Sequence, residues 1–407
     1  MQTKISKAYK HRSEVKLAEN ILRSCVHCGF CTATCPTYQL LGDELDSPRG
    51  RIYLIKQMLE GNQVTQKTQT HLDRCLTCRS CETTCPSGVQ YGQLIDIGRE
   101  LVEESVPRKL VDKTQRFLLR KIFPFPARLS LLLKAGRFSS ALLPEKIKQK
   151  LPKKHDFPVP TIKPSKHKRK MLVLEGCVQS VVTPSTNVFA KSVFDKLKIE
   201  LISVKNAGCC GALSHHMSKT DEAKHFVKKN IDAWWPYIEN TAENIIVTAS
   251  GCGAMVKDYG HILKDDIEYS EKAKKVSSVC KDISEIISKE TLHTDKSKAS
   301  KTIVAFHSPC TLQHGQQLNG IVENILSNAG FTLASVEDAH LCCGSAGTYS
   351  ILQPDLSSKL LTNKLSHLQS GNPDVIATAN IGCQSHLATQ AKAPVKHWIE
   401  LLNDVIC

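Results

Sequence analysis

Eight cysteines near the N-terminus repeat one spacing. Each run reads C-x2-C-x2-C-x3-C-P, and the runs are Cys25, Cys28, Cys31 and Cys35 before Pro36, then Cys75, Cys78, Cys81 and Cys85 before Pro86. Three thiolates at i, i+3 and i+6 can hold three corners of a 4Fe–4S cubane, while the fourth cysteine turns away and ligates the other cluster. The pattern therefore predicts two 4Fe–4S clusters. Cys25, Cys28, Cys31 and Cys85 would hold cluster 1, and Cys75, Cys78, Cys81 and Cys35 would hold cluster 2.

A pair of zinc sites is the alternative for these cysteines, because C-x2-C pairs also build zinc ribbons. Two full copies with the trailing proline favour iron–sulfur clusters. Between the motifs, Ile52, Ile55 and Leu59 recur at helical spacing, so we expect a helical ferredoxin-like domain over residues 1–115. Arg49 and Arg51 are interpreted as solvated surface arginines, with pairing to cluster charge or to a partner carboxylate as the alternative.

A second cysteine pattern, C…CCG…C, occurs twice in the last part of the chain. The first copy is Cys177, Cys209, Cys210 and Cys252, and the second is Cys310, Cys342, Cys343 and Cys383. In both copies the first cysteine precedes the adjacent pair by 32 residues (209 − 177 and 342 − 310), and the copies are offset by 133 (310 − 177). Such matched spacing predicts a duplication, with domains at 171–290 and 301–407.

The elements that must position these cysteines repeat as well. An apolar, β-rich run precedes the first cysteine, the CCG triplet and the last cysteine of each copy, and helical patterns lie between them, at residues 187–198, 321–328 and 355–368. Strands alternating with helices predict a parallel α/β sheet in each half. Ligand sites gather at the C-terminal ends of such strands, so four thiols per half should converge. The alternative is that these cysteines are small buried residues beside glycine turns.

Other polar residues receive a structural interpretation. Cys280 has no cysteine counterpart in the second copy, where aligning VCKDI with VKHWI places Lys396 opposite it, and Cys407 is terminal. Both are interpreted as cysteines that bind no metal or cofactor. The histidines near the cysteine loops are interpreted as polar loop residues: His215, His216, His307, His314 and His340. Because no dinucleotide or P-loop motif is present, we expect no catalytic residue and no bound flavin or NAD.

Residues 116–170 are expected to form a basic, proline-rich linker. Within it, residues 128–143 form a possible amphipathic helix, which would lie either on an anionic membrane face or against a neighbouring domain. Residues 144–170 hold ten Lys and Arg against two acids, which supplies +8 of the net charge of +15, together with five prolines. With the basic charge concentrated there and no nucleic-acid motif, we expect no nucleic-acid partner.

The composition excludes several protein classes. The chain has 407 residues and 18 cysteines, its N-terminus has no apolar signal-peptide core, and no run approaches the roughly 18 apolar residues of a membrane span. These features exclude a secreted disulfide scaffold and an integral membrane protein, and they place the chain in a reducing cytoplasm. The expected fold class is α+β overall, a helical ferredoxin-like domain followed by two α/β cysteine-rich domains.

These motifs, with the uninterrupted stretch LLGDELDSPRGRIYLIKQ, resemble the iron–sulfur subunits of bacterial glycolate oxidase over nearly the whole chain. The resemblance implies that separate flavin subunits oxidise glycolate to glyoxylate and that this chain passes the electrons towards the membrane quinone pool. It also implies a hetero-oligomer at the inner face of the cytoplasmic membrane. The iron–sulfur subunits of lactate-utilisation and anaerobic glycerol-3-phosphate dehydrogenase systems share the layout and are the alternatives.

The cysteine-rich halves depart from a related pattern. In heterodisulfide-reductase-type domains the last cysteine begins C-x-x-C, whereas Met255 and His386 stand at that fourth position here. Because imidazole is the better ligand, the second half is the better candidate for an iron–sulfur or zinc centre, held by Cys310, Cys342, Cys343, Cys383 and His386. A thiol-reducing enzyme and a scaffold that uses clusters structurally are the competing functions.

Overall fold

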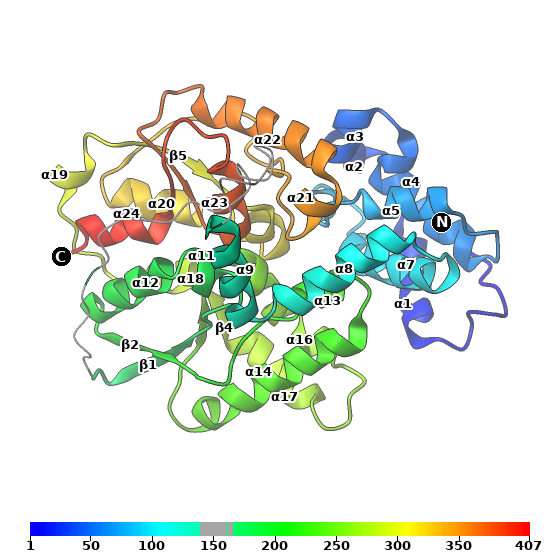
Figure 1. Ribbon diagram of the computed structural model, residues 1–407, viewed down its shortest axis with the longest axis horizontal. Coiled ribbons are helices and arrows are strands. Elements are labelled where there is room, and N and C mark those ends of the chain that lie inside the picture. Colours follow the sequence, from blue (N-terminus) through cyan, green and yellow to red (C-terminus); the bar gives the residue numbers. More distant parts are fainter. Residues whose placement is uncertain (139–159, 161–165) are drawn as a thin grey trace.

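The computed structural model describes residues 1–138, 160 and 166–407. Figure 1 shows a helical N-terminal region, in blue and cyan, beside two α/β halves, one green and one yellow to red. None of the helices in these described residues is long and apolar enough to span a membrane. The predicted fold class is confirmed.

The N-terminal region is helical because each cysteine run contains a short helix, α2 or α6, and the connecting segments carry apolar residues at helical spacing. Its longest helices share one buried core that includes Leu22, Ile55 and Leu94. Helix α4 begins where Ser47 Oγ accepts the Gly50 amide at 3.0 Å, with Pro48 in the first turn, a favourable helix start. The elements are α1 (Ser13–Ser24), α2 (Phe30–Ala33), α3 (Pro36–Leu41), η1 (Glu44–Asp46), α4 (Pro48–Leu59), α5 (Gln66–Asp73), α6 (Ser80–Thr83) and α7 (Tyr91–Ser105).

Each α/β half contains a four-stranded parallel sheet. The strand order is β2-β1-β3-β4 in the first half and β6-β5-β7-β8 in the second. The six strands expected beside the cysteines are confirmed: β1 (Arg169–Val173), β2 (Ile199–Ser203), β3 (Ile245–Val247), β5 (Ile303–His307), β6 (Thr332–Leu333) and β7 (Val375–Thr378). The edge strands β4 (Cys280–Asp282) and β8 (Val395–His397) are not among the strands predicted from the sequence.

Helices cover both sheets and complete the duplication. The first half has α11 (Gln179–Val182), α12 (Ser185–Lys196), α13 (Ala212–His216), α14 (Thr220–Asn240), α15 (Ser250–Lys257), α16 (Tyr259–Ile262), α17 (Ser270–Val279) and α18 (Ile283–Ile287). The second has α19 (Lys296–Ala299), the π-helical turn η3 (Thr311–Gly315), α20 (Ile321–Asn328), α21 (Tyr349–Leu352), α22 (Pro354–Gln369), α23 (Ile381–Leu387) and α24 (Trp398–Val405). The three helical segments expected from the sequence correspond to α12, α20 and α22.

The edge strands correct one detail of the repeat alignment. Ile245 pairs with Cys280 and Val247 with Asp282, while Ile376 pairs with Val395 and Thr378 with His397. Counting back from the last cysteine of each half makes Val247 equivalent to Thr378, so Val395, not Lys396, stands opposite Cys280. The apolar residues alone favour an alignment that is one residue out, because they do not reveal the register of the edge strands. Cys280 still has no cysteine counterpart.

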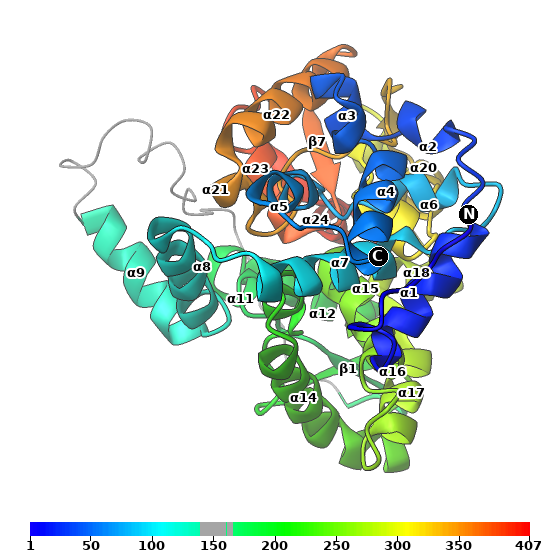
Figure 2. The ribbon, with the colours of Figure 1, turned by 90° about the vertical axis from the view of Figure 1, so that its right-hand side faces the viewer.

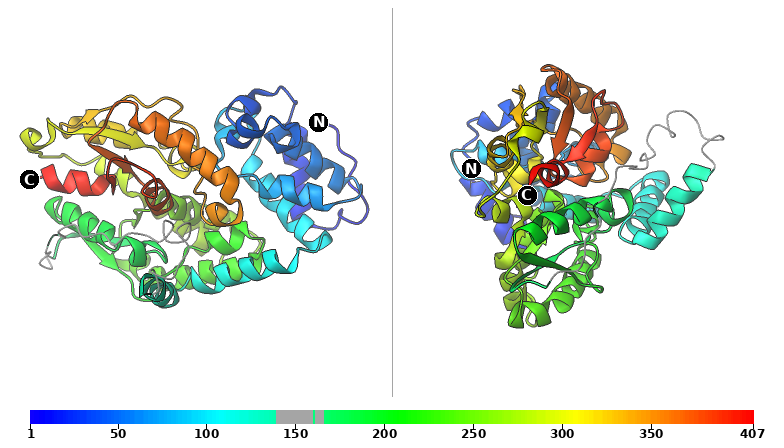
Figure 3. Two further views of the ribbon diagram at one scale, coloured as in Figure 1. Left: turned by 45° about the horizontal axis from the view of Figure 1, so that its top comes forward. Right: turned by 90° about the vertical axis from the view of Figure 1, so that its left-hand side faces the viewer.

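The two halves share a hydrophobic core. Helix α12 of the first half packs on α24 of the second, and Phe194 and Trp398 lie fully buried in one cluster that spans both sheets. Figure 3 shows the two halves in contact along this side, with the N-terminal region beyond them. The halves therefore hold a fixed relative position, which allows sites at their strand ends to face one another.

Two helices, α8 (Leu110–Ile122) and α9 (Pro126–Phe138), form the start of the expected linker. Helix α9 begins two residues earlier than predicted, because proline is favourable in the first helical turn, and residues 139–143 lie outside the described part. Its Leu129 and Leu133 pack against Ala249 and Ile381 of the two halves, as the domain-packing alternative requires. Leu131 and Leu132 are 71% and 48% exposed. Figure 2 shows this helix pair projecting from one side of the molecule.

Candidate metal centres

The two ferredoxin-type loops share an unusual backbone conformation. His27 and Gly29 around Cys28 have positive φ, at 58° and 87°, and Thr77 and Arg79 around Cys78 repeat this with 53° and 62°. Such left-handed positions are rare outside glycine and cost strain. They wrap each loop into a concave turn, and their recurrence 50 residues apart indicates one structural requirement met twice.

Each predicted ligand set lines its own cavity. One cavity is lined by the cysteines predicted for cluster 1, Cys25, Cys28, Cys31 and Cys85, and Cys81 also reaches it. A second is lined by those predicted for cluster 2, Cys35, Cys75, Cys78 and Cys81. In both cavities the fourth cysteine of one run stands with the first three of the other. The folded chain thus brings together the donor sets that a pair of cubanes requires.

Several thiols in these cavities are buried in surroundings that favour the neutral form. Burial raises the pKa of Cys31 to about 11 and holds the pKa of Cys78 and Cys81 well above the ordinary thiol range. Buried neutral thiols of this kind become thiolates when a metal replaces their protons. Arg99 of α7 fixes the second loop, because its guanidinium donates to the carbonyl oxygens of Leu72 at 2.9 Å and Cys75 at 2.6 Å. Arg99 is not predicted from the sequence, because it lies on a helix outside the cysteine motif.

One of the two arginines assigned to the solvated surface is buried. Arg51 is 1% exposed, its Nη2 lies 3.3 Å from Asp46 Oδ1, and it lines the cavity of the second ligand set. Arg51 also donates to the carbonyl oxygen of His71 at 2.7 Å and to Thr37 Oγ1 at 3.1 Å, so its burial depends on the packing of α5 and α3 against α4. Arg49 is partly exposed as expected and pairs with Glu44.

The cysteines of each half converge at the C-terminal edge of its sheet. In the second half, Cys310 follows β5, the Cys342–Cys343 pair follows β6, and Cys383 lies in the first turn of α23 after β7. Cys310 Sγ lies 3.9 Å from Cys342 Sγ, and the Gly344 amide donates to Cys342 Sγ at 3.4 Å. Cys343 contacts both Cys342 and Cys383. The four sulfur atoms form a continuous row.

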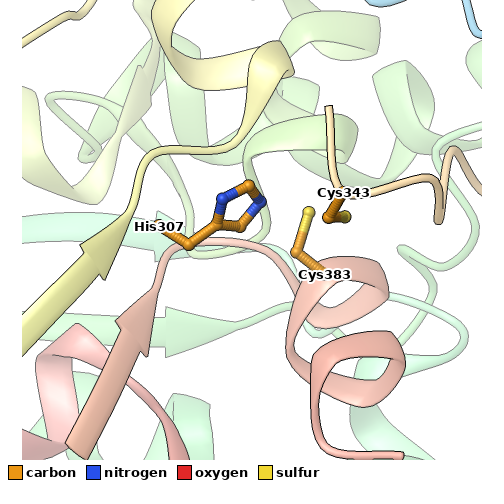
Figure 4. A group of neighbouring side chains, drawn as sticks. All are labelled: His307, Cys343 and Cys383. Carbon is orange, nitrogen blue, oxygen red and sulfur yellow. The ribbon is translucent and has the colours of Figure 1, made fainter. Parts of the chain in front are cut away.

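A histidine completes this row. Figure 4 shows His307, the last residue of β5, facing Cys343 and Cys383, and the three donor atoms all lie within 4.8 Å of one another. His307 was interpreted from sequence as a polar loop residue, but it ends a buried strand and is 2% exposed. His386, the predicted ligand, is not part of this group of three; its Nε2 is 3.1 Å from Ser357 Oγ.

The first half repeats the cysteine arrangement without the histidine. Cys209 contacts Cys177 and Cys210, and Cys210 contacts Cys252. The Gly211 amide donates to Cys209 Sγ at 3.5 Å, as Gly344 does in the second half. Within the described residues, none of the compact groups of three metal-type side chains comes from these cysteines. The two halves thus differ in their donor sets.

The other histidines connect the N-terminal region to the halves. His314 Nδ1 lies 2.9 Å from Thr83 Oγ1, and its Nε2 contacts the carbonyl oxygen of His340 at 3.0 Å. His215 and His216 each approach the Asp96 carboxylate at 3.4 Å. These contacts cross between regions, so the histidines position the cysteine loops relative to one another.

All the cysteine loops except the first meet at one larger cavity, of about 310 Å3. Its wall includes cysteines from both halves and the loop of the second ligand set: Cys177, Cys209, Cys210, Cys252, Cys310, Cys342, Cys383 and Cys75, followed by Leu76 and Thr77. Cys78 also packs against the cluster formed by Cys310, Cys342 and Tyr349. The second ferredoxin-type loop therefore lies directly against the second half, whereas Cys28 of the first loop is exposed.

Comparisons with known proteins agree with this architecture. Residues 21–89 match the family of 4Fe–4S dicluster domains, and residues 171–257 and 304–388 match the cysteine-rich domain family. The chain is 52% identical over 406 residues to the glycolate oxidase iron–sulfur subunit of Escherichia coli (strain K12), covering 100% of this chain and 99% of the relative. It is 29% identical over 407 residues to the probable glycolate oxidase iron–sulfur subunit of Bacillus subtilis (strain 168), covering 93% and 90%.

A more distant relative matches part of the chain. Lactate utilization protein A of Bacillus cytotoxicus is 24% identical over 243 residues, which cover 58% of this chain and 98% of that protein. The full-length match at 52% identity is much the stronger. The chain is an iron–sulfur protein of the oxidoreductase class, and it belongs to the family of glycolate oxidase iron–sulfur subunits.

Proposed function

We propose that this chain is the electron-transfer subunit of a complex that oxidises glycolate to glyoxylate, and that it carries two 4Fe–4S clusters but no flavin. Flavin-containing partner subunits perform the oxidation, and this chain accepts their electrons one at a time. The observation that carries the proposal is the pair of cavities, each lined by three cysteines of one run and the fourth of the other. The full-length relationship to a glycolate oxidase iron–sulfur subunit supports the substrate.

The residues fit the clusters that the family implies. A 4Fe–4S cluster, when bound, supplies a one-electron acceptor held by four thiolates. Cys25, Cys28, Cys31 and Cys85 would hold one, and Cys75, Cys78, Cys81 and Cys35 the other. Arg51 and Arg99 bring positive charge to the second set, and charge of this sign favours the reduced state of an anionic centre.

The position of each ligand set in the fold supports a direction of electron transfer. Cys28 is exposed, and the neighbouring Val26 and Phe30 are 67% and 61% exposed, so we infer that the flavoprotein docks there. Cys78 instead packs against Cys310 and Cys342 of the second half, and its loop reaches the shared cavity through Cys75, Leu76 and Thr77. We infer that electrons leave on that side, towards an acceptor of the quinone class. A volume of about 310 Å3 lies in the usual range for small-molecule sites.

The helix pair α8–α9 supports attachment to a membrane surface. Arg116 of α8 and Phe123 line the shared cavity, so the cavity opens beside these helices. Their exposed apolar residues are Leu110, Val111, Phe117, Leu118, Leu131, Leu132 and Phe138. Basic residues accompany them, as in helices that lie on anionic lipid. We propose that the complex associates peripherally with the inner face of the cytoplasmic membrane through this pair.

The function is tested in membranes from cells that lack this chain. Glycolate-dependent quinone reduction should be lost there and restored by the wild-type chain. Cys78→Ser should fail to restore it, whereas Cys407→Ser should restore it fully, because Cys407 is exposed and belongs to neither ligand set. Retained glycolate-dependent reduction without the chain would refute the proposal. If membranes without the chain lost quinone reduction with lactate or glycerol 3-phosphate, but kept it with glycolate, the substrate would have to be reassigned.

Membrane attachment is tested separately with the purified chain and sedimented vesicles. Binding to vesicles that contain anionic lipid should weaken in the Leu131→Ser/Leu132→Ser variant and fall as salt rises. Equal binding to neutral vesicles, or unchanged binding by the variant, would contradict a role for the exposed face of α9.

A further inference from the structure

The two halves differ at the end of their first strand. Because the first cysteines are offset by 133 residues (310 − 177), Leu174 of the first half is equivalent to His307 of the second. Both side chains are 2% exposed. A leucine at this place is an ordinary core residue, so the fold itself does not require a histidine there.

The buried imidazole of His307 lacks the partners that a structural histidine would have. Neither ring nitrogen has a hydrogen-bond partner among the residues that the structure describes. Buried polar groups are almost always satisfied, since leaving one unpaired costs about 1–3 kcal/mol. An unpartnered buried imidazole that faces thiols therefore indicates a ligand.

The neighbours of His307 are donors of the right kind. Cys343 Sγ and Cys383 Sγ lie within 4.8 Å of a ring nitrogen of His307 and of one another (Figure 4). With metal–sulfur bonds of about 2.3 Å and metal–nitrogen bonds of about 2.0 Å, tetrahedral donors lie roughly 3.5–3.8 Å apart. Small rotamer shifts would bring these three atoms to that separation. Thiolate and imidazole together suit zinc and iron.

A second buried difference adds positive charge to the same half. A Cβ on Gly211 would meet the Ala223 carbonyl oxygen, and one on Gly344 would meet that of Ser357. These contacts align α14 with α22 at an offset of 134 (357 − 223), which makes Asn230 equivalent to Lys364.

Lys364 is 4% exposed, and its Nζ donates to the Asp338 carbonyl oxygen at 2.7 Å. Among the described residues, no carboxylate lies within salt-bridge distance of it. In the first half the neutral Asn230 donates to the Cys209 carbonyl oxygen at 2.9 Å instead. A buried ammonium is costly without a counter-charge, and the sulfur atoms of Cys342 and Cys343, which carry negative charge as thiolates, are close enough to favour it.

The second half has His386 where the first half has Met255, and this difference has a separate explanation. At the same alignment, Ala223 becomes Ser357, whose hydroxyl donates to the Gly344 carbonyl oxygen at 2.7 Å and contacts His386 Nε2 at 3.1 Å. The serine and the imidazole thus occur together in the second half, and both are absent from the equivalent positions of the first half. His386 is accounted for by this contact with the CCG loop.

We propose that His307, together with Cys343 and Cys383, ligates a zinc-type or iron-type metal centre in the second half, beside the shared cavity, whose wall includes Cys383. The proposal rests on the proposed function, since this centre would stand beside the second ligand set of the electron relay. It adds a nitrogen ligand that the cysteine pattern does not contain and separates the role of His307 from that of His386.

The test counts metal in the purified full chain, prepared anaerobically with iron and sulfide. The wild type should contain metal beyond the about eight irons of two cubanes. His307→Leu, which installs the residue of the first half, should lose that additional metal while the reduced-state EPR of the two cubanes stays unchanged. The matched control His386→Met also installs a first-half residue and should keep the metal.

X-ray absorption of the wild type at the edge of the additional metal gives a readout that does not depend on variant folding. Imidazole scattering beside sulfur ligands is expected, and ligation by sulfur alone would overturn the proposal. No metal beyond about eight irons in the wild type, or full metal retention by His307→Leu, would overturn it as well. Absence of the cubane EPR signals in the wild type would instead refute the proposed function, so the two failures are distinguishable.

Discussion

Arg51 Nη2 lies 3.3 Å from Asp46 Oδ1, and both side chains are almost fully buried, at 1% and 0% exposed. Asp46 also contacts Arg74 Nη1 at 2.8 Å and His71 Nδ1 at 3.0 Å. This carboxylate therefore joins η1, α4 and the residue before Cys75 in one network. The network supports the cavity lined by Cys35, Cys75, Cys78 and Cys81.

Asp46→Ala should strongly destabilise the N-terminal region. Removing one partner of a buried ion pair leaves an uncompensated charge and costs about 3–5 kcal/mol. Anaerobic denaturant unfolding should report this loss. The control Glu44→Gln breaks the exposed pair with Arg49 and should change stability by about 0–1 kcal/mol. Equal effects of the two variants would contradict the structural role assigned to Asp46.

The contact of Asp96 with His215 predicts a pH dependence of docking between α7 and α13. The neighbouring histidines lower the pKa of Asp96 although burial opposes this, and the Asp96 carboxylate raises the pKa of His215 although burial opposes that as well. The carboxylate contributes stability above the ordinary aspartate pKa of about 3.9 and loses it as pH falls. The histidine contributes fully below about pH 6.5 and loses its contribution as pH rises through its raised pKa.

Asp96→Asn should therefore destabilise the chain more at pH 6 than at pH 8.5, by about 1 kcal/mol. The measurement is the difference in free energy of unfolding between wild type and variant at each pH. Thr220→Val is the matched control, because it removes the Thr220–Glu100 hydrogen bond across the same interface without removing a group that titrates in this range. A pH-independent Asp96→Asn effect would refute the assignment.

Local spacing explains what the sequence predicted and long-range packing explains what it did not. The cysteines could be predicted because cluster loops place Cys25, Cys28 and Cys31 within one turn, and because β-rich runs before Cys177 and Cys310 identify strands. Burial of Arg51 depends on a helix contact that leaves no local pattern. His307 left a weak signal, a histidine that ends an apolar strand where the other copy has Leu174, but a single unmatched residue does not reveal its neighbours.

Phe30→Ser should impair electron delivery from the flavoprotein while leaving the clusters intact. Phe30 begins α2 beside the exposed Cys28 and is itself 61% exposed, and exposed aromatic residues of this kind commonly anchor interfaces. Loss of one such anchor typically costs about 2 kcal/mol or more of binding, so the apparent affinity for the flavin subunits should fall at least about tenfold. Titration of the variant chain with its flavin subunits measures this.

Ile267→Ser serves as the control for that experiment, because Ile267 is also fully exposed but lies between α16 and α17 in the first half. It should leave the affinity unchanged. Unchanged iron content in Phe30→Ser would show that the clusters are intact. If Phe30→Ser bound the flavin subunits as tightly as the wild type, the docking side near Cys28 would be wrong.

The glycines of the two CCG triplets should differ from each other in their tolerance to substitution. Gly344 has φ +86°, and a Cβ there would lie 2.7 Å from the Ser357 carbonyl oxygen, whereas at Gly211, with φ +90°, the nearest atom would be the Ala223 carbonyl oxygen at 3.2 Å. Both alanine variants carry the strain of a left-handed residue, about 1–3 kcal/mol. Gly344→Ala should cost more, because α22 must also move.

Gly347→Ala is the control, since Gly347 has φ +65° but no atom within 4 Å of its added Cβ. Thermal unfolding under anaerobic conditions should rank the melting temperatures Gly344→Ala lowest, Gly211→Ala next and Gly347→Ala highest of the three. Because Gly344 donates its amide to Cys342 Sγ, the same variant should also disturb the cysteine row of the second half. A melting temperature for Gly344→Ala equal to that for Gly347→Ala would mean that α22 yields without cost, contrary to the close packing seen between it and the CCG loop.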